Sequence, residues 1–223
     1  MAAGAAFGTI NGYVYAIAFY HRISGLANPC ANDVVISVVE AGKRVCPKNQ
    51  NRKEPLTRSD KRLLFNHLTP GYSLVHQRLW VMCSLMFAGF LRFDEVSTIR
   101  LKDFTFKEGH LTIHLPRSKV DALRLGDRIH IASSASVTCP VLALNNYLIR
   151  VDVSSGCEFV FRRILHTKTG GRLASTNVPV SYNTVRRDFL RVVSQAGLDS
   201  SRVGLHSFRS GGATLAANEG VCD

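Results

Sequence analysis

Hydrophobic residues recur along this chain at helical spacing and, in a few short segments, at strand spacing. Apolar positions repeat helically over residues 9–23 and 34–41, and a nearly unbroken apolar run covers residues 79–91. A membrane span needs about 20 apolar residues, so this shorter run instead predicts a central buried helix over residues 73–88. Further helices are expected over residues 57–69, 141–149 and 182–196, and from Ser207 a last helix is expected to continue to Asp223.

Strand-like segments follow the central helix. They cover residues 104–106, 110–115 and 128–131, and Lys107-Glu108-Gly109 predicts a turn between the first two. The stretch 151–180 is rich in glycine and loop-forming residues, with one short buried piece at 159–161. The pattern therefore predicts a mainly α-helical protein with a small antiparallel β-sheet, an α+β fold.

Three parts of the chain differ in character. Residues 1–46 hold two helices, which are too few for an independent core and suggest a partial helical domain. Residues 47–56 combine Pro, Asn and Gln with basic side chains and are expected to form a basic linker. Residues 57–223 are expected to form the second, larger domain.

The charge of the chain indicates an acidic partner. Lys and Arg number 28 against 16 Asp and Glu, which gives a net charge of +12. Such an excess fits nucleic acid or an anionic membrane surface. Its distribution through structured segments, without a long polybasic tail, favours a folded face that binds double-stranded DNA over an unstructured arm, and no membrane partner is expected. Candidate DNA-binding residues are Lys43, Arg44, Lys48, Arg52 and Lys53 around the linker, and Arg186 and Arg187 in the helix 182–196.

Cysteine spacing and the N-terminus indicate an intracellular protein. None of the six cysteines forms a C-x-x-C pair, and residues 1–8 lack the basic start of a signal peptide. No clustered ligands suggest a metal site, and no cofactor is expected. We expect an intracellular location, which would be nuclear in a eukaryotic host.

Three motifs carry candidate chemistry. His206-Ser207-Phe208-Arg209 places an imidazole and a guanidinium on one face at a helix start, a position that suits a phosphate. In Gly89-Phe90-Leu91-Arg92-Phe93-Asp94-Glu95, an arginine stands at a helix junction with an acid three residues later. Between these motifs, Lys119 lies at the start of the link between two expected strands.

This ordered set resembles the catalytic set of the tyrosine recombinases, the phage-integrase superfamily. The sequence motifs G-F-L-R-F-x-E and H-S-x-R-x-G-G-A-T are most similar to those of the branch carried by transposable elements. The resemblance implies that residues 57–223 form the recombinase catalytic domain. It also implies that residues 1–46 are the end of a SAM-like core-binding domain and that the linker tracks DNA between the two.

The resemblance also implies a role for each residue of the set. Arg92 and Arg209 would stabilise charge on the phosphate oxygens, and Lys119 would protonate the leaving 5′-oxygen. His206 would bind the phosphate or accept a proton, while Glu95 would orient its neighbours or simply pair with Arg92. All four phosphate-site residues are expected to converge on one basic cleft, without a metal.

The family's nucleophile is a tyrosine that lies beyond the second arginine. The 14 residues after Arg209 contain no Tyr, Trp or His, and Tyr147 and Tyr182 lie upstream in helix patterns. We therefore expect a recombinase fragment truncated before its nucleophile and inactive as it stands, able to assemble with other copies on DNA. The alternatives are a non-catalytic DNA-binding protein derived from a mobile element and a helical protein-interaction module.

Overall fold

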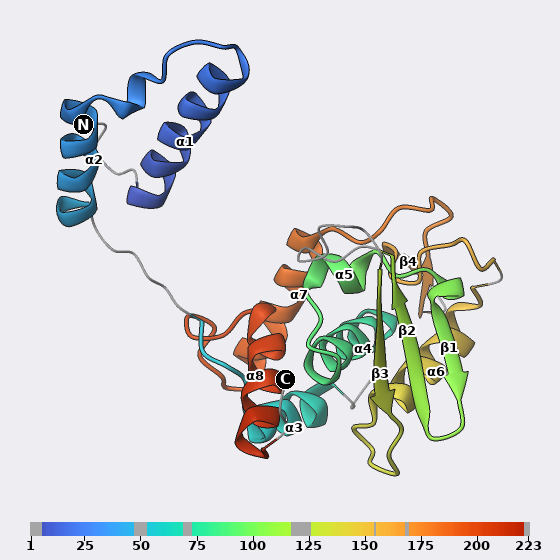
Figure 1. Ribbon diagram of the computed structural model, residues 1–223. Coiled ribbons are helices and arrows are strands. Elements are labelled where there is room, and N and C mark those ends of the chain that lie inside the picture. The colour runs from blue at the N-terminus through green and yellow to red at the C-terminus, as the bar shows by residue number, and fades with distance from the viewer. Residues whose placement is uncertain are drawn as a thin grey trace. The chain divides into compact units, whose positions relative to one another are not determined.

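The computed structural model describes residues 6–46, 53–68, 73–116, 126–153, 155–167 and 170–220. They form two compact units, and the chain divides between them after Asn51 (Figure 1). Each unit is described separately below.

The first unit is a pair of helices joined by a short 3-10 turn. Helix α1 (Phe7–Ile23) is followed by η1 (Pro29–Ala31) and α2 (Asp33–Val45), and the Asn32 side chain accepts a hydrogen bond from the Val34 backbone N–H at the start of α2. The apolar pattern over residues 34–41 predicted this helix, which continues past the buried Gly42 to Val45. Helix α1 buries none of its residues, so this pair holds almost no core of its own.

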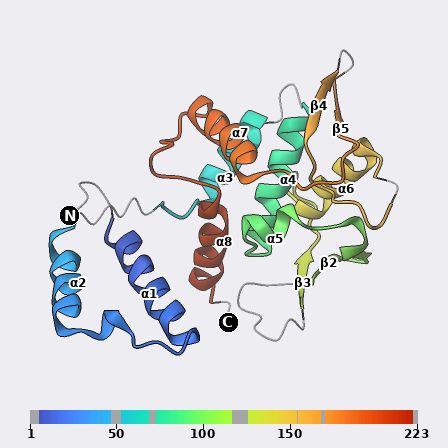
Figure 2. The same ribbon diagram turned by 90° about the horizontal axis from the view of Figure 1, so that it is seen from above.

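The second unit is built around α4 (Leu74–Ala88), as the apolar run predicted. Ser73 caps its start, and twelve of its residues are buried, including Trp80 and Met82. Helices α3 (Arg58–Leu68), α5 (Phe93–Ser97), α6 (Pro140–Val151), α7 (Tyr182–Gln195) and α8 (His206–Asn218) all contact α4 (Figures 1 and 2). A helix that is apolar on most of its faces is stable only when it is surrounded in this way.

A three-stranded antiparallel sheet lies beside these helices. After the 3-10 turn η2 (Leu101–Asp103), the strands are β1 (Phe104–Lys107), β2 (His110–Leu115) and β3 (Asp127–Ala132), in the order β1-β2-β3. The buried side chains of Leu111, Ile113 and Ile131 join the sheet to the core around α4. These three strands and the helices confirm the predicted α+β class.

The later part of the chain differs from the expected pattern at two places. The stretch 151–180 is not only loop, because β4 (Ile164–Thr167) and β5 (Gly170–Leu173) pair as an antiparallel hairpin. Each of these strands has only four residues, too few to display a clear alternation of polar and apolar positions. Helix α8 stops at Asn218 instead of continuing through Asp223, and Gly220 follows in a left-handed conformation with φ of 75°.

One buried ion pair fastens α7 to α4. The Arg78 guanidinium on α4 donates to the Asp188 carboxylate on α7 at 3.0 Å and to the Arg162 carbonyl oxygen at 3.0 Å. Only 2% of the Arg78 side chain and 11% of the Asp188 side chain are exposed. A charge this deeply buried is tolerated only when a partner compensates it, so the pair fixes the packing of two helices. Within the described ranges, no helix combines the length and apolar character needed to cross a membrane.

Candidate phosphate-binding site

Arg92 stands where the chain leaves the end of α4 and enters α5. The neighbouring side chains of Leu91, Phe93 and Val96 are buried and anchor this short helix to the core. Glu95 accepts a hydrogen bond from the Arg92 backbone N–H at 2.7 Å, which closes the first turn of α5. The Arg92 side chain therefore begins from a fixed point, and 30% of it is exposed.

Glu95 connects the two arginines that the motifs singled out. Its carboxylate lies 2.9 Å from Arg92 Nη1 and 3.8 Å from Arg209 Nη1, and only 8% of the Glu95 side chain is exposed. Burial and then the charge of Arg92 lower the pKa of Arg209, while Glu95 acts in the opposite direction. The structure thus brings two guanidinium groups from distant motifs together around one carboxylate.

Phe90 provides a second contact for Arg209. The Arg209 guanidinium donates to the Phe90 backbone carbonyl. Phe90 has a φ of 50°, in the left-handed region where residues other than glycine are uncommon. Such a backbone costs about 1–3 kcal/mol and persists only where the surroundings enforce it. The motif sequence did not predict the contact between Arg209 and the Phe90 carbonyl, because it gives no sign of a left-handed phenylalanine.

Helix α8 presents His206 and Arg209 one turn apart at its start. The buried side chains of Leu205 and Phe208 dock this end of the helix, and Phe208 packs edge-on against Phe189 of α7. His206 is exposed, and its ring has no hydrogen-bond partner among the residues that the structure describes. An imidazole that is free of internal partners is available to a bound anion.

Two glycines allow α8 to approach the rest of the unit closely. A Cβ added to Gly211 would lie 2.1 Å from the Leu56 carbonyl oxygen, and one added to Gly212 would lie 1.9 Å from the Phe87 carbonyl oxygen. Both distances are far below van der Waals contact. The Gly-Gly pair of the motif is therefore a packing requirement that holds Arg209 next to Phe90 and Glu95.

Lys119 lies outside the described residues, so its position is not assigned. The strand that precedes it ends beside the arginine pair, because Leu115 and Pro116 line a pocket of about 380 Å³ together with Glu95. The chain therefore enters residues 117–125 from the neighbourhood of Glu95. The predicted role of Lys119 stays a prediction.

The candidate DNA-binding residues outside the motifs have varied surroundings. Lys48 and Arg52 lie outside the described residues, whereas Lys43 and Arg44 are exposed in the last turn of α2. Lys53 was expected in the linker, but its ammonium donates to the carbonyl oxygens of Ser200 and Ser201 in the second unit. On α7, Arg186 and Arg187 are both exposed, and Arg187 lies 3.8 Å from Asp188.

Two described tyrosines of the second unit have partners of their own. Tyr147 is fully buried in α6 and donates to the Val160 carbonyl oxygen at 3.3 Å. Tyr182, at the start of α7, packs edge-on against Phe93 with the ring centroids 5.2 Å apart, and it is partly exposed. In the described ranges, no cluster of three His, Cys, Asp or Glu side chains could hold a metal ion.

Comparison with known proteins identifies the fold around this site. The pattern that defines the phage integrase family matches residues 54–222. The chain belongs to the phage integrase family. An integrase/recombinase xerD homolog from Selenomonas ruminantium is 29% identical over 218 residues, which cover 96% of this chain and 61% of that protein. The chain thus spans about three fifths of that relative's length.

Solved structures of integrases and recombinases share the fold. The integrase of the Tn1549 transposon, in complex with transposon right end DNA, superposes with a TM-score of 0.65 at 17% identity, over 97% of this chain and 69% of that one. The XerH site-specific recombinase bound to difH substrate gives a TM-score of 0.56 at 13% identity, over 96% of this chain and 60% of that one. At such low identity these likenesses establish the fold of this family member.

Proposed function

We propose that this chain engages duplex DNA as a tyrosine-recombinase-type protein of strand cleavage and rejoining, and that Arg92 and Arg209 hold the scissile phosphate. The observation that carries the proposal is the convergence of the two guanidinium groups on Glu95. Membership of the phage integrase family supports it, as do the DNA complexes named for the Tn1549 integrase and XerH.

The chemistry follows from the arrangement of charges. Attack on a phosphodiester places negative charge on the non-bridging oxygens, and two preorganised guanidinium groups stabilise that charge. Glu95 holds both groups at one place while 30% of the Arg92 side chain and 29% of the Arg209 side chain stay exposed to a ligand. In this proposal His206 adds a hydrogen bond to the phosphate, and Lys119 protonates the leaving oxygen.

The first prediction concerns the salt dependence of DNA binding. We expect the affinity for a mixed-sequence 30-base-pair duplex to fall steeply with salt, because each neutralised phosphate contributes about −0.9 to the slope of log K against log salt. The double variant Arg92→Gln/Arg209→Gln should bind more weakly and with a shallower slope. Fluorescence anisotropy at several salt concentrations measures both quantities.

A charge-matched control separates this pair from general basicity. Arg62→Gln/Arg172→Gln removes two exposed positive charges from α3 and β5, away from Glu95. Its loss of affinity should be clearly smaller than that of the arginine-pair variant. Equal losses in the two variants, or an affinity that does not change with salt, would refute the proposal and favour a protein-interaction module.

The second prediction is that the 223-residue chain binds DNA without forming a covalent adduct. Charge stabilisation alone supplies no attacking oxygen in line with the bond. The buried Tyr147 hydroxyl donates a hydrogen bond to the Val160 carbonyl oxygen, and the Tyr182 ring packs against Phe93. Incubation with a nicked suicide substrate, followed by denaturing electrophoresis, should therefore show no protein–DNA band.

The same gel can contradict this prediction. An adduct that is lost in Arg209→Ala would show that the chain contains its own nucleophile. Because Tyr182 packs next to the residue that follows Arg92, Tyr182→Phe would then be the first variant to test, with Tyr147→Phe and the serine near His206 after it.

The proposal extends to the assembly of the protein on DNA and to its location in the cell. Copies of the chain would assemble on one DNA site, and sedimentation with and without duplex measures that assembly. A protein that acts on chromosomal or mobile-element DNA would lie inside the cell, and in the nucleus of a eukaryotic host.

A further inference from the structure

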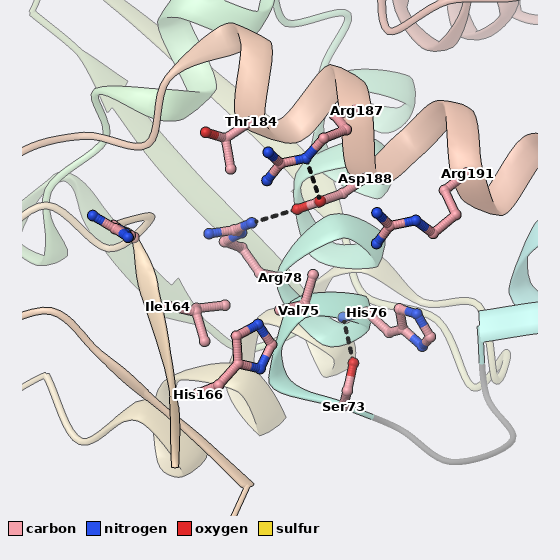
Figure 3. A pocket seen from close by; sticks show the side chains of 11 residues that line it. Ser73, Val75, His76, Arg78, Ile164, His166, Thr184, Arg187, Asp188 and Arg191 are labelled. Atoms are coloured by element: carbon pink, nitrogen blue, oxygen red, sulfur yellow. Dashed lines mark hydrogen bonds and ion pairs between the residues drawn. The ribbon is translucent and has the colours of Figure 1, made fainter.

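A second concentration of positive charge lies at the other end of α4. It is a pocket of about 640 Å³ formed by the start of α4, the β4 strand with the residue before it, and one face of α7 (Figure 3). The lining includes four arginines, two histidines and one aspartate: Arg78, Arg163, Arg187, Arg191, His76, His166 and Asp188. This pocket is not part of the arginine pair around Glu95.

The pocket carries far more positive than negative charge. Among the described residues that line it, Asp188 is the one acidic side chain, and it is already bonded to Arg78 and lies near Arg187. Arg163 and Arg191 are exposed, and their guanidinium groups have no ion-pair or hydrogen-bond partner among the described residues. The neighbouring segments 69–72 and 168–169, whose structure is not described, contain no Asp or Glu in their sequence. An arrangement of like charges around one hollow suits an anion.

The floor of the pocket contains an unused donor. Arg78 is 2% exposed, and its terminal nitrogens donate to Asp188 and to the Arg162 carbonyl. Its Nε, however, has no hydrogen-bond partner in the described part of the chain. Buried guanidinium donors are normally satisfied, so an unpaired one on a residue that lines a charged hollow favours a ligand near it.

Distance separates this pocket from the arginine pair. His76 lies in the first turn of α4, and Ala88, just before the left-handed Phe90, is its last residue. At 1.5 Å per residue, the two ends of the helix are about 18 Å apart. One phosphate therefore does not reach both sites.

We propose that this pocket is a second anion site and binds a phosphate group. Arg163, Arg187 and Arg191 would grip the phosphate oxygens, since the guanidinium fork matches phosphate geometry. The group could come from the backbone of a bound DNA strand or from a free polyphosphate such as a nucleotide. The first source rests on the proposed function, whereas the second does not.

The test begins with inorganic triphosphate in the absence of DNA. Isothermal titration calorimetry should detect binding to the full chain, and Arg163→Gln/Arg191→Gln should bind about tenfold more weakly for each guanidinium removed. Arg92→Gln/Arg209→Gln should still bind at the pocket. Arg163 and Arg191 are both exposed, so their replacement should leave the fold intact, and thermal unfolding checks this.

The control variant Arg62→Gln/Arg172→Gln removes the same number of positive charges, from residues that do not line the pocket. Triphosphate affinity should change less than about twofold in this control, because neither residue lines the pocket and both side chains are exposed to screening solvent. The proposal is overturned if the pocket variant binds as the unmodified chain does, if the control loses as much, or if the Arg92→Gln/Arg209→Gln variant abolishes all triphosphate binding.

Duplex binding identifies the source of the phosphate. If DNA supplies it, the pocket variant also reduces the salt slope for the duplex by about one per lost phosphate contact. If a free polyphosphate supplies it, triphosphate binding is lost while the DNA slope is unchanged. Failure of the proposed function gives a different result, since the arginine-pair variant would then bind duplex as the unmodified chain does.

Discussion

Replacement of Asp188 by Ala should lower the free energy of unfolding by about 3–5 kcal/mol, the usual cost of leaving one member of a buried ion pair without its partner. The Arg78 side chain is 2% exposed, so without the carboxylate its charge is left largely desolvated. The lost bond also joins α7 to α4 across the core. Urea unfolding followed by the fluorescence of Trp80, the only tryptophan and a buried residue of α4, measures the change.

An exposed ion pair provides the control. Arg58 and Glu219 pair on the surface, where their side chains are 65% and 51% exposed. Glu219→Ala should change stability by less than about 1 kcal/mol, because exposed pairs contribute little. In the double variant Arg78→Met/Asp188→Leu, much of the lost stability should return, since no charge is left uncompensated. An Asp188→Ala protein as stable as the original would show that Arg78 finds another partner.

This ion pair also shows what the sequence could not predict. The apolar run correctly predicted α4 as the central helix, because a pattern over fifteen residues is a local signal. Arg78 lies within α4 just before that run, and nothing in the neighbouring sequence indicates its partner, which lies 110 residues later. A contact over such a separation depends on how the helices pack, and neighbouring residues carry no record of it.

The candidate sites divide in the same way. The motifs placed Arg92 at a helix junction with Glu95 three residues later, and His206 and Arg209 at the start of a helix, and the structure has both arrangements. The pocket around Arg78 was missed because its lining comes from α4, α7 and the β4–β5 hairpin, and the hairpin itself was read as loop. Of the two neighbouring candidate DNA-binding residues Arg186 and Arg187, Arg187 lines the pocket and Arg186 does not, since successive helical residues point about 100° apart.

The phosphate site depends on close packing as much as on charge, and Gly212→Ala tests that dependence. The added methyl group would lie 1.9 Å from the Phe87 carbonyl oxygen, so the backbone of α8 or of α4 would have to shift. Alanine favours a helix over glycine by about 1 kcal/mol, so propensity alone predicts a more stable protein. Steric overlap should outweigh that gain, and we expect a net loss of at least about 2 kcal/mol in unfolding free energy.

A matched substitution separates propensity from packing. A Cβ added to Gly12, within α1, would meet nothing within 4 Å, so Gly12→Ala should leave the unfolding of the second unit unchanged. Gly212→Ala should also weaken DNA binding, because α8 has to shift away from Phe87 and carries Arg209 away from Glu95 and the Phe90 carbonyl. A folded Gly212→Ala protein with unaltered stability and DNA affinity would mean that Arg209 does not depend on this contact. The expected paired loss would instead establish the close approach of the two helices as the feature that holds the arginine pair together.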